Sequence, residues 1–298
     1  MTTLNKRIQL IFIASYPRSG STILDVLIRK TKDSNFISIG EFFYIFEKGF
    51  TNNELCADGL KFLDHPFWKE IFLNLDHEKA AKELDFFKNP LFFPIFFFIG
   101  SINKTILINF FPNLFQTFNT ALERIHKNSG KRIIIDASKD PRQLFILTLL
   151  RKVDIEIIHL IRDSRATAFS WKKKKIYKEN VYFKKKSILR SSLRWMNDHL
   201  WLILLAKINF KIPYKRLFYE DLDKIHNFTF FEKKYYVDLK KEFTKFNIEI
   251  GGNVNKFLSF KSINIDNEWK IIMKKIDFTL ATFLTWPFII YFNYKIKK

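Results

Sequence analysis

The chain has little cysteine, glycine and proline. It contains one cysteine, eight glycines and eight prolines among 298 residues. A single cysteine excludes an intramolecular disulfide, so the chain is not a disulfide-bonded secreted scaffold and suits a reducing compartment. No internal repeat and no low-complexity linker interrupts the sequence. We therefore expect a single domain over residues 1–298.

Acidic residues are also scarce, with 30 Asp and Glu against 51 Lys and Arg and a net charge of +21. An excess of this size favours an anionic partner, such as a nucleotide, an acidic glycan or an anionic lipid surface. We expect no nucleic-acid partner, because no recognised nucleic-acid-binding motif accompanies the charge. Lys, Asn, Ile and Phe are abundant together, so AT-rich codon usage is an alternative origin of the charge.

The chain lacks a comfortable membrane span. Residues 89–120 are rich in Phe but contain three prolines and a lysine, and the apolar part of the C-terminal segment 278–298 is interrupted by Pro287. We interpret both as helices of the core or of a pocket for the molecule on which the protein acts. The alternative is an interfacial anchor, since aromatic residues beside basic ones suit a lipid headgroup layer. Residues 1–15 predict a first strand rather than a signal peptide. We expect a cytoplasmic protein, with membrane-surface contact as the open alternative.

The remaining pattern alternates strands and helices. Short apolar runs predict strands at 8–14, 36–39, 132–136, 155–161 and 214–218. Helices are predicted near 21–31, 140–152, 163–171, 187–207 and 232–246. This rhythm is typical of an α/β fold with a central parallel sheet and helices on both faces, to which residues 89–120 add a Phe-rich helical insert. Ligands bind such folds at the carboxyl ends of the strands.

The first of these strand ends carries an unusual density of hydrogen-bond donors. The loop before the first helix contains Arg18, Ser19, Gly20, Ser21 and Thr22. Helix N-termini attract anions, because their first N–H groups have no intrahelical partner and the helix dipole is positive there. We therefore predict a phosphate- or sulfate-binding loop. The alternative is an ordinary turn in which the hydroxyls cap the helix and the glycine relieves strain.

The same loop matches a nucleotide-binding P-loop only in shape. The template G-x-x-x-x-G-K-[ST] places Ser15 at its first glycine, Gly20 at its second and Ser21 at its lysine. The defining lysine is therefore missing, and Arg18 is the cation nearest to the glycine. We predict a P-loop-like three-layer fold but keep a nucleotide-dependent kinase only as an alternative function.

Two motifs resemble those of sulfotransferases that use 3′-phosphoadenosine 5′-phosphosulfate (PAPS). "YPRSGST", residues 16–22, resembles the loop that holds the 5′-phosphosulfate in that family. "RDSRATAFS", residues 162–170, resembles the R-D-P-R-x-x-x-x-S element that holds the 3′-phosphate, with Ser164 at the proline position. The matching residues of the second motif are Arg162, Asp163, Arg165 and Ser170.

Three further segments extend the resemblance toward bacterial-type sulfotransferases. These are residues 39–71, residues 133–144 and "GGNVNKF" at 251–257, where Lys256 stands at the position of a family arginine. The first segment keeps Cys56 but has Asp58 and His65 where relatives carry two more cysteines. One thiol alone forms neither a metal site nor a bridge, so we predict neither feature here.

The resemblance implies a sulfuryl transfer from PAPS to a hydroxyl or amine of an acceptor, such as a carbohydrate or lipid, without a metal. The cofactor-binding residues that it implies are Arg18, Ser19, Gly20, Ser21, Thr22, Arg162, Ser170 and Lys256. Arg18 and Lys139 are the implied catalytic cations and Glu41 the implied general base, with His159 and His199 as weaker candidates for the base.

Two questions stay open at this stage. The basic stretch 172–190 is either a solvated loop or a flap over the donor or an anionic acceptor. A noncatalytic protein that binds a membrane or a polyanion is the second alternative to an enzyme. The charged residues retained in both motifs argue against that alternative.

Overall fold

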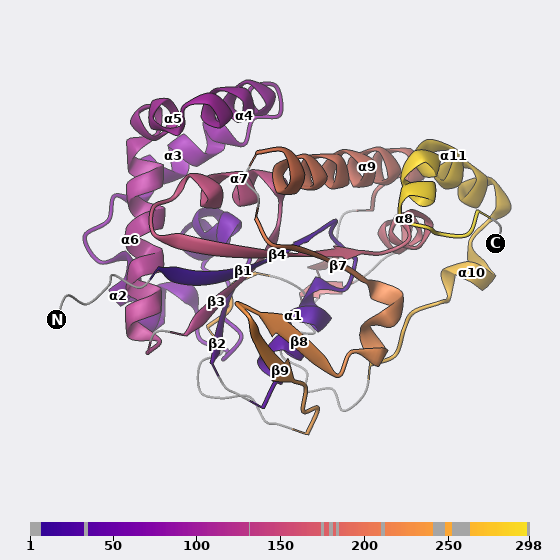
Figure 1. Ribbon diagram of the computed structural model, residues 1–298, viewed down its shortest axis with the longest axis horizontal. Coiled ribbons are helices and arrows are strands. Elements are labelled where there is room, and N and C mark those ends of the chain that lie inside the picture. Colours follow the sequence, from indigo (N-terminus) through magenta and orange to yellow (C-terminus); the bar gives the residue numbers. More distant parts are fainter. Residues whose placement is uncertain are drawn as a thin grey trace.

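A five-stranded parallel sheet forms the centre of the computed structural model (Figure 1). The structure describes residues 7–32, 35–130, 132–173, 176–178, 181–182, 185–209, 212–240, 248–251 and 263–296. The strands are β1 (Ile8–Ser15), β2 (Phe36–Gly40), β3 (Ile133–Lys139), β4 (Val153–Ile161) and β7 (Tyr214–Phe218), in the order β2-β3-β1-β4-β7. All five predicted strands are confirmed, because their apolar, β-branched runs suit a sheet that is covered on both faces.

Alternate side chains of β1 define two apolar layers. Leu10 and Phe12 pack with α6 (Pro112–Asn128), α7 (Pro141–Leu149) and the segment after β2. Ile11 and Ile13 pack on the other face with α1 (Ser21–Arg29), η5 (Tyr219–Lys224) and the hairpin β8 (Asn227–Phe230)–β9 (Lys233–Tyr236). The chain is therefore a three-layer α/β fold, as the sequence predicts.

The Phe-rich insert is helical, as predicted. Residues 89–120 contain α4 (Phe93–Ile102), α5 (Lys104–Phe110) and the start of α6, and two helices precede them, α2 (Pro66–Phe72) and α3 (His77–Phe87). Rings of Phe87, Phe96 and Phe111 lie 5.2–5.5 Å apart between their centroids and join the insert to α3. Figure 1 shows α4 and α5 at its outer end, away from the sheet.

The C-terminal part packs over the helices that follow β4. These are α8 (Ser164–Lys172) and α9 (Ile188–Leu204), and α10 (Trp269–Ile272) and α11 (Lys275–Tyr291) lie against them. Short elements complete the described chain: η1 (Phe42–Tyr44), η2 (Ile45–Thr51), η3 (Phe62–Asp64), β5 (Ile176–Lys178), β6 (Val181–Tyr182) and η4 (Leu205–Asn209). None of the helices in the described ranges has both the length and the apolar character needed to cross a membrane.

The helix predicted at 232–246 is wrong in its described part. Lys233–Tyr236 forms strand β9, and Phe231 and Glu232 have positive φ angles of 46° and 66° that turn the chain into it. Tyr235 is buried while its neighbours are exposed, which is a two-residue period rather than a helical one. Residues 241–247 lie outside the described ranges.

Candidate functional site

Four loops meet at the carboxyl edge of the sheet. Ala14 of β1 pairs with Lys139 of β3, and Ser15 pairs with Leu160 of β4. The segments that follow β1, β2, β3 and β4 therefore start side by side. This edge is where parallel α/β sheets bind ligands.

The loop between β1 and α1 is tightly constrained. Arg18 has a φ of 78° and Gly20 a φ of 90°, and a Cβ atom at Gly20 would lie 2.5 Å from the ring of Tyr219. Both the backbone angle and the close ring therefore require glycine. Gly20 is the N-cap of α1 and provides no side chain to cap it, and the first turn of α1 has no acidic residue. Both features leave the N-terminus of α1 suited to an anion.

The two predicted anion-binding motifs are in direct contact. Arg162 Nη1 donates a hydrogen bond to the Arg18 carbonyl at 3.1 Å, and Arg162 Nη2 lies 3.2 Å from Asp266 Oδ2. The Arg162 guanidinium also lies 4.0 Å from the centroid of the Tyr219 ring. It is 5% exposed and fixed in place by these contacts. Because the carboxyl ends of parallel strands share one edge, the sequence predicts that the two motifs are neighbours. It does not identify Tyr219 and Asp266 as partners of Arg162.

Buried hydroxyl groups in and next to the two motifs lack partners. Within the described residues, the Oγ atoms of Ser15, Ser19 and Ser170 and the phenol oxygen of Tyr16 make no hydrogen bond. Ser19 is fully buried and Ser170 is 3% exposed. A buried hydroxyl without a partner costs on the order of 1–3 kcal/mol, so such groups usually belong to a site where a ligand or water completes them.

Cations gather beside the same loop. The Arg18 guanidinium lies 4.8 Å from the centroid of a Trp171 ring, and Lys186 Nζ lies 3.5 Å from the same side chain's ring. Partial burial, the largest cause, and the charges of Arg194 and Arg190 together lower the pKa of Lys186 to about 8. A lysine that is repelled in this way reports a positive potential that suits an anion. Lys186 belongs to the predicted basic stretch, most of whose side chains lie outside the described residues.

Glu41 lies at the end of β2 between two lysines. Its carboxylate accepts hydrogen bonds from Lys139 Nζ and Lys48 Nζ, one at each oxygen. Burial alone would raise the pKa of Glu41, but the charges of Lys139 and Lys48 outweigh it and lower the pKa to about 2. The predicted base is therefore a carboxylate at neutral pH, yet it binds a proton weakly while both lysines are in place.

The segment around Glu41 is closely packed. Lys139 has a φ of 70°, and its Nζ also donates to the Ala137 carbonyl at 2.9 Å. Gly251 packs closely against Glu41 and Lys48, because a Cβ atom at position 251 would lie 2.8 Å from Lys48 Nζ and 3.1 Å from Glu41 Cβ. The sequence does not identify Lys48 as a partner, although it follows Glu41 by seven residues, through a 3-10 turn and a π-helical segment. Lys256, the predicted cofactor-binding lysine, lies outside the described residues.

Asp136 and the two histidines point to the interior. Asp136 accepts hydrogen bonds from Ser138 N at 2.8 Å and Gln143 Nε2 at 2.8 Å, and burial raises its pKa to about 6. His159 and His199 are fully buried and lie 2.5 Å apart between Nε2 and Nδ1. Burial lowers the pKa of His159 to about 3 and that of His199 well below its usual value. The pair is core structure and is not retained as a general base.

We predict that this neutral pair makes the fold sensitive to acid. In the unfolded chain both histidines take up a proton below about pH 6.5, whereas in the folded chain His159 resists it down to about pH 3 and burial lowers the pKa of His199 as well. Stability therefore falls as the pH drops through this window, by about 1.4 kcal/mol per pH unit for each histidine. His199→Phe should reduce that slope by about one histidine between pH 6 and pH 4 in urea titrations. The exposed His226→Gln is the control, and equal slopes in wild type and His199→Phe would contradict the prediction.

Other matched residues serve the structure. Arg165 is 2% exposed and donates to Asp163 Oδ1 at 2.8 Å and to the Lys295 carbonyl at 2.8 Å, so it fastens the C-terminal segment to α8. Asp58 and His65, at the positions of the missing cysteines, lie 2.9 Å apart and join the ends of their loop. No group of three or more His, Cys, Asp or Glu side chains in the described ranges is placed to hold a metal ion.

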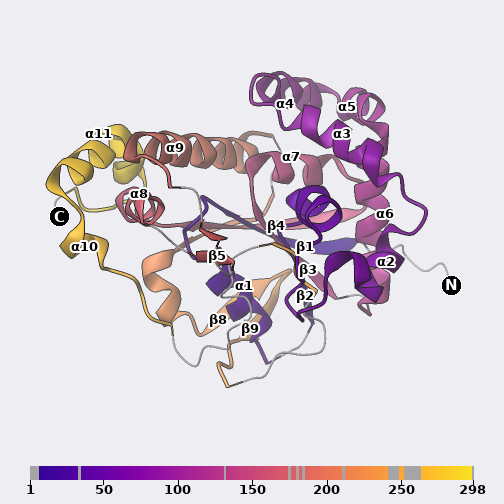
Figure 2. The ribbon, with the colours of Figure 1, turned by 180° about the vertical axis from the view of Figure 1, so that it is seen from behind.

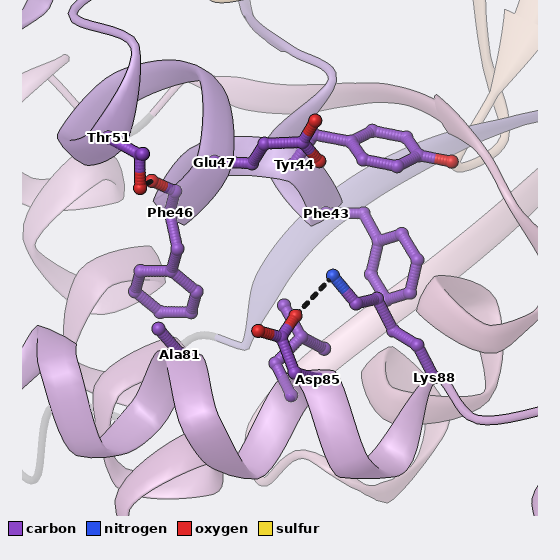
Figure 3. A pocket seen from close by; sticks show the side chains of 9 residues that line it. Phe43, Tyr44, Phe46, Glu47, Thr51, Ala81, Asp85 and Lys88 are labelled. Atoms are coloured by element: carbon purple, nitrogen blue, oxygen red, sulfur yellow. Dashed lines mark hydrogen bonds and ion pairs between the residues drawn. The ribbon is translucent and has the colours of Figure 1, made fainter.

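A cavity of about 230 Å³ lies between α3 and the segment that follows Glu41. Figure 3 shows Phe46 and Ala81 on one side of it and the ion pair of Asp85 and Lys88 on the other. Its lining combines aromatic rings with polar groups: Phe43, Tyr44, Phe46, Glu47, Thr51, Ala81, Leu84, Asp85 and Lys88.

Comparisons of the chain with known proteins identify no family. No protein-family model and no curated protein matches the chain. The residues described above are therefore the basis of the functional argument.

Proposed function

We propose that the chain is a PAPS-dependent sulfotransferase. The observation that carries the proposal is the contact between Arg162 and the Arg18 loop, together with the unpartnered buried hydroxyls of Ser19 and Ser170 in the same two motifs. One ligand with two anionic groups would satisfy both motifs. PAPS carries a phosphosulfate at its 5′ end and a phosphate at its 3′ position, which is the charge pattern that these residues suit.

The donor would be held by the two motifs in different ways. The N–H groups of Ser19, Gly20, Ser21 and Thr22 and the Arg18 side chain would bind the 5′-phosphosulfate at the N-terminus of α1. Arg162 and Ser170 would bind the 3′-phosphate. Lys186, the cation near Arg18 and Trp171, adds positive charge to the same region.

The transfer then needs a proton acceptor and charge stabilisation. The acceptor oxygen or nitrogen would form a bond to sulfur while the bond from sulfur to the 5′-phosphate oxygen breaks, leaving adenosine 3′,5′-bisphosphate. Arg18 and Lys139 would stabilise the charge that develops on the leaving oxygen. Glu41 would take the acceptor's proton.

The low pKa of Glu41 fits this scheme only if donor binding changes it. An anion beside Lys139 and Lys48 competes with Glu41 for their charge and repels its carboxylate. Both effects raise the pKa of Glu41 from its value of about 2. The base would therefore become stronger when the donor is in place.

The acceptor would approach from the cavity beside Glu41. This cavity lies between the segment that follows Glu41 and α3, the helix that precedes the Phe-rich insert. Its mixed aromatic and polar lining suits a hydroxylated acceptor, either a carbohydrate or the headgroup of a lipid.

Binding of adenosine 3′,5′-bisphosphate tests the proposal directly. We expect micromolar affinity by calorimetry and much weaker binding of ATP, because the loop lacks the P-loop lysine. Preference for ATP would favour the kinase alternative, and binding of neither nucleotide would favour the noncatalytic one.

Arg162→Ala should separate the two phosphate sites. Loss of a charged hydrogen bond to the 3′-phosphate is expected to weaken adenosine 3′,5′-bisphosphate by about 1.5–3 kcal/mol. Adenosine 5′-phosphosulfate, which lacks the 3′-phosphate, should lose little affinity. Equal weakening of both ligands in calorimetry would instead show that Arg162 acts by supporting the loop through the Arg18 carbonyl.

A further inference from the structure

Helix α4 leaves an apolar face uncovered. It contains no charged residue, and its buried side, with Phe93 and Phe96, packs against Phe87 of α3. The other side exposes Ile95 by 52%, Phe98 by 65% and Ile102 by 71%. These positions recur every three to four residues and form one stripe on the helix. Exposed apolar side chains continue before and after it, at Leu91, Ile106 and Phe110.

Helix α11 has a second stripe of the same kind. Ile276, Phe283 and Trp286 are exposed by 75%, 71% and 53%, and Leu280 and Ile290 continue the row. No charged residue occurs between Phe278 and Tyr294. A stripe this long is unusual on a surface that meets only water.

Both helices lie on the same side of the molecule. Figures 1 and 2 are related by a turn about the vertical axis, and both show α4, α5, α9 and α11 along the top. Helix α9 lies between the other helices and exposes Leu189, Leu193 and Leu200. The hairpin β8–β9 lies on the opposite side in both views.

Cations accompany the exposed apolar residues on these helices. Those that the structure leaves exposed are Lys104 on α5, Arg190 and Arg194 on α9, and Lys274 and Lys275 at the start of α11, of which Arg194 lies 3.7 Å from Asp198 on the same helix. Asp277, the acid in the first turn of α11, is paired with Lys172 at 2.6 Å. The combination of apolar stripes and surrounding cations is complementary to an anionic lipid surface, where tails meet negatively charged headgroups.

We propose that the side formed by α4, α9 and α11, here named the docking face, binds peripherally to an anionic membrane. The apolar side chains enter the headgroup layer from two separate points, and the cations lie against the phosphates. Two anchors fix the orientation of the molecule as well as its attachment. Because α11 packs on α8, which carries Ser170, docking also holds the site of the proposed function close to the lipid surface.

Vesicle binding tests the proposal without any enzymatic assay. Wild-type protein should sediment with vesicles of phosphatidylglycerol and phosphatidylcholine, and less with phosphatidylcholine alone or in high salt. Phe98→Glu and Phe283→Glu should each reduce the partition coefficient about tenfold or more. Tyr236→Glu is the matched control, because Tyr236 is an exposed aromatic residue on β9, on the opposite side. Unchanged binding of both docking-face variants would overturn the proposal.

A labelling experiment guards against loss of folding in these variants. The chain has a single cysteine, Cys56, and it is buried. An environment-sensitive dye on Phe98→Cys or Phe283→Cys should shift to the blue when anionic vesicles are added, and on Tyr236→Cys it should not. No shift at positions 98 and 283 would overturn the proposal. Self-association of the lipid-free protein that Phe98→Glu abolishes would also do so, since it would show a second copy as the occupant.

The outcome is independent of the proposed function. Adenosine 3′,5′-bisphosphate should bind Phe98→Glu and Phe283→Glu as it binds wild type. Vesicle binding without nucleotide binding would keep the docking face and remove the sulfotransferase assignment. Nucleotide binding without vesicle binding would do the reverse.

Discussion

Glu41→Gln is expected to reduce sulfuryl transfer by about 100- to 10,000-fold, because the amide keeps the shape of the side chain but does not take a proton. Donor affinity should be preserved or increased. In wild type, Glu41 holds Lys139 and Lys48, so a bound anion competes with its carboxylate for both lysines. Removing the negative charge frees the lysines for the donor.

Two measurements separate this role from a structural one. Transfer from labelled donor to lipid and glycan fractions gives the rate, and calorimetry with adenosine 3′,5′-bisphosphate gives the affinity. Lys139→Ala should lower both quantities, whereas Glu41→Gln should lower only the rate. The exposed Glu78→Gln is the matched control and should change neither. Normal turnover in Glu41→Gln would exclude it as the base.

Glu41→Gln should also lower the melting temperature, because Glu41 does more than a carboxylate at a helix N-terminus. A helix-terminal carboxylate contributes about 1 kcal/mol or less, whereas Glu41 compensates two partly buried cations. Its pKa of about 2 lies below the usual 4.5, so its contribution is present above about pH 4.5 and is lost as the pH falls toward 2. A lower melting temperature at neutral pH is therefore expected together with the loss of turnover.

Arg18→Ala is expected to lower the transfer rate by about 100- to 1000-fold, the usual cost of one preorganised donor to developing charge. The melting temperature should change by only a few degrees. The close contact of Gly20 with Tyr219 and the hydrogen bond from Arg162 to the Arg18 carbonyl both involve the backbone. They survive truncation of the side chain, and alanine keeps the Cβ atom at the same positive φ.

Two further variants serve as references for Arg18→Ala. Arg18→Lys keeps the charge without the planar donor fork, so partial activity is expected. Arg151→Ala removes an exposed arginine distant in sequence from the loop and should leave the rate unchanged. Wild-type turnover in Arg18→Ala would remove Arg18 from the catalytic residues.

The strands and the meeting of the two motifs could be predicted because each depends on a strong local pattern. Runs such as Ile133–Ile135 favour buried parallel strands, and the carboxyl ends of such strands share one edge. The partners of individual side chains could not be predicted in this way. Lys139 reaches Glu41 from a left-handed backbone position that is rare for lysine, and Lys186 reaches Trp171 from a stretch that reads as a solvated loop. Sequence periodicity carries no information on such turns.

The wrong helix has a similar physical cause. Residues 232–246 contain five Lys and two Glu, which favour helices when nothing else decides. Tyr235 instead packs on Phe36 of β2, with 4.8 Å between the ring centroids, so burial against the sheet overrides the local propensity.

The position of β1 in the middle of the sheet has a consequence for synthesis on the ribosome. β1 pairs with β3 and β4, and β2 pairs with β3, so neither early strand has a partner until residues 133–161 have emerged. Until then the entire Phe-rich insert has to be translated while two apolar strands keep their edges open. Such long-range pairing slows folding and leaves edges exposed to aggregation. The nascent chain therefore depends on early packing of the insert, or on chaperones, to protect these strands before the sheet can close around them.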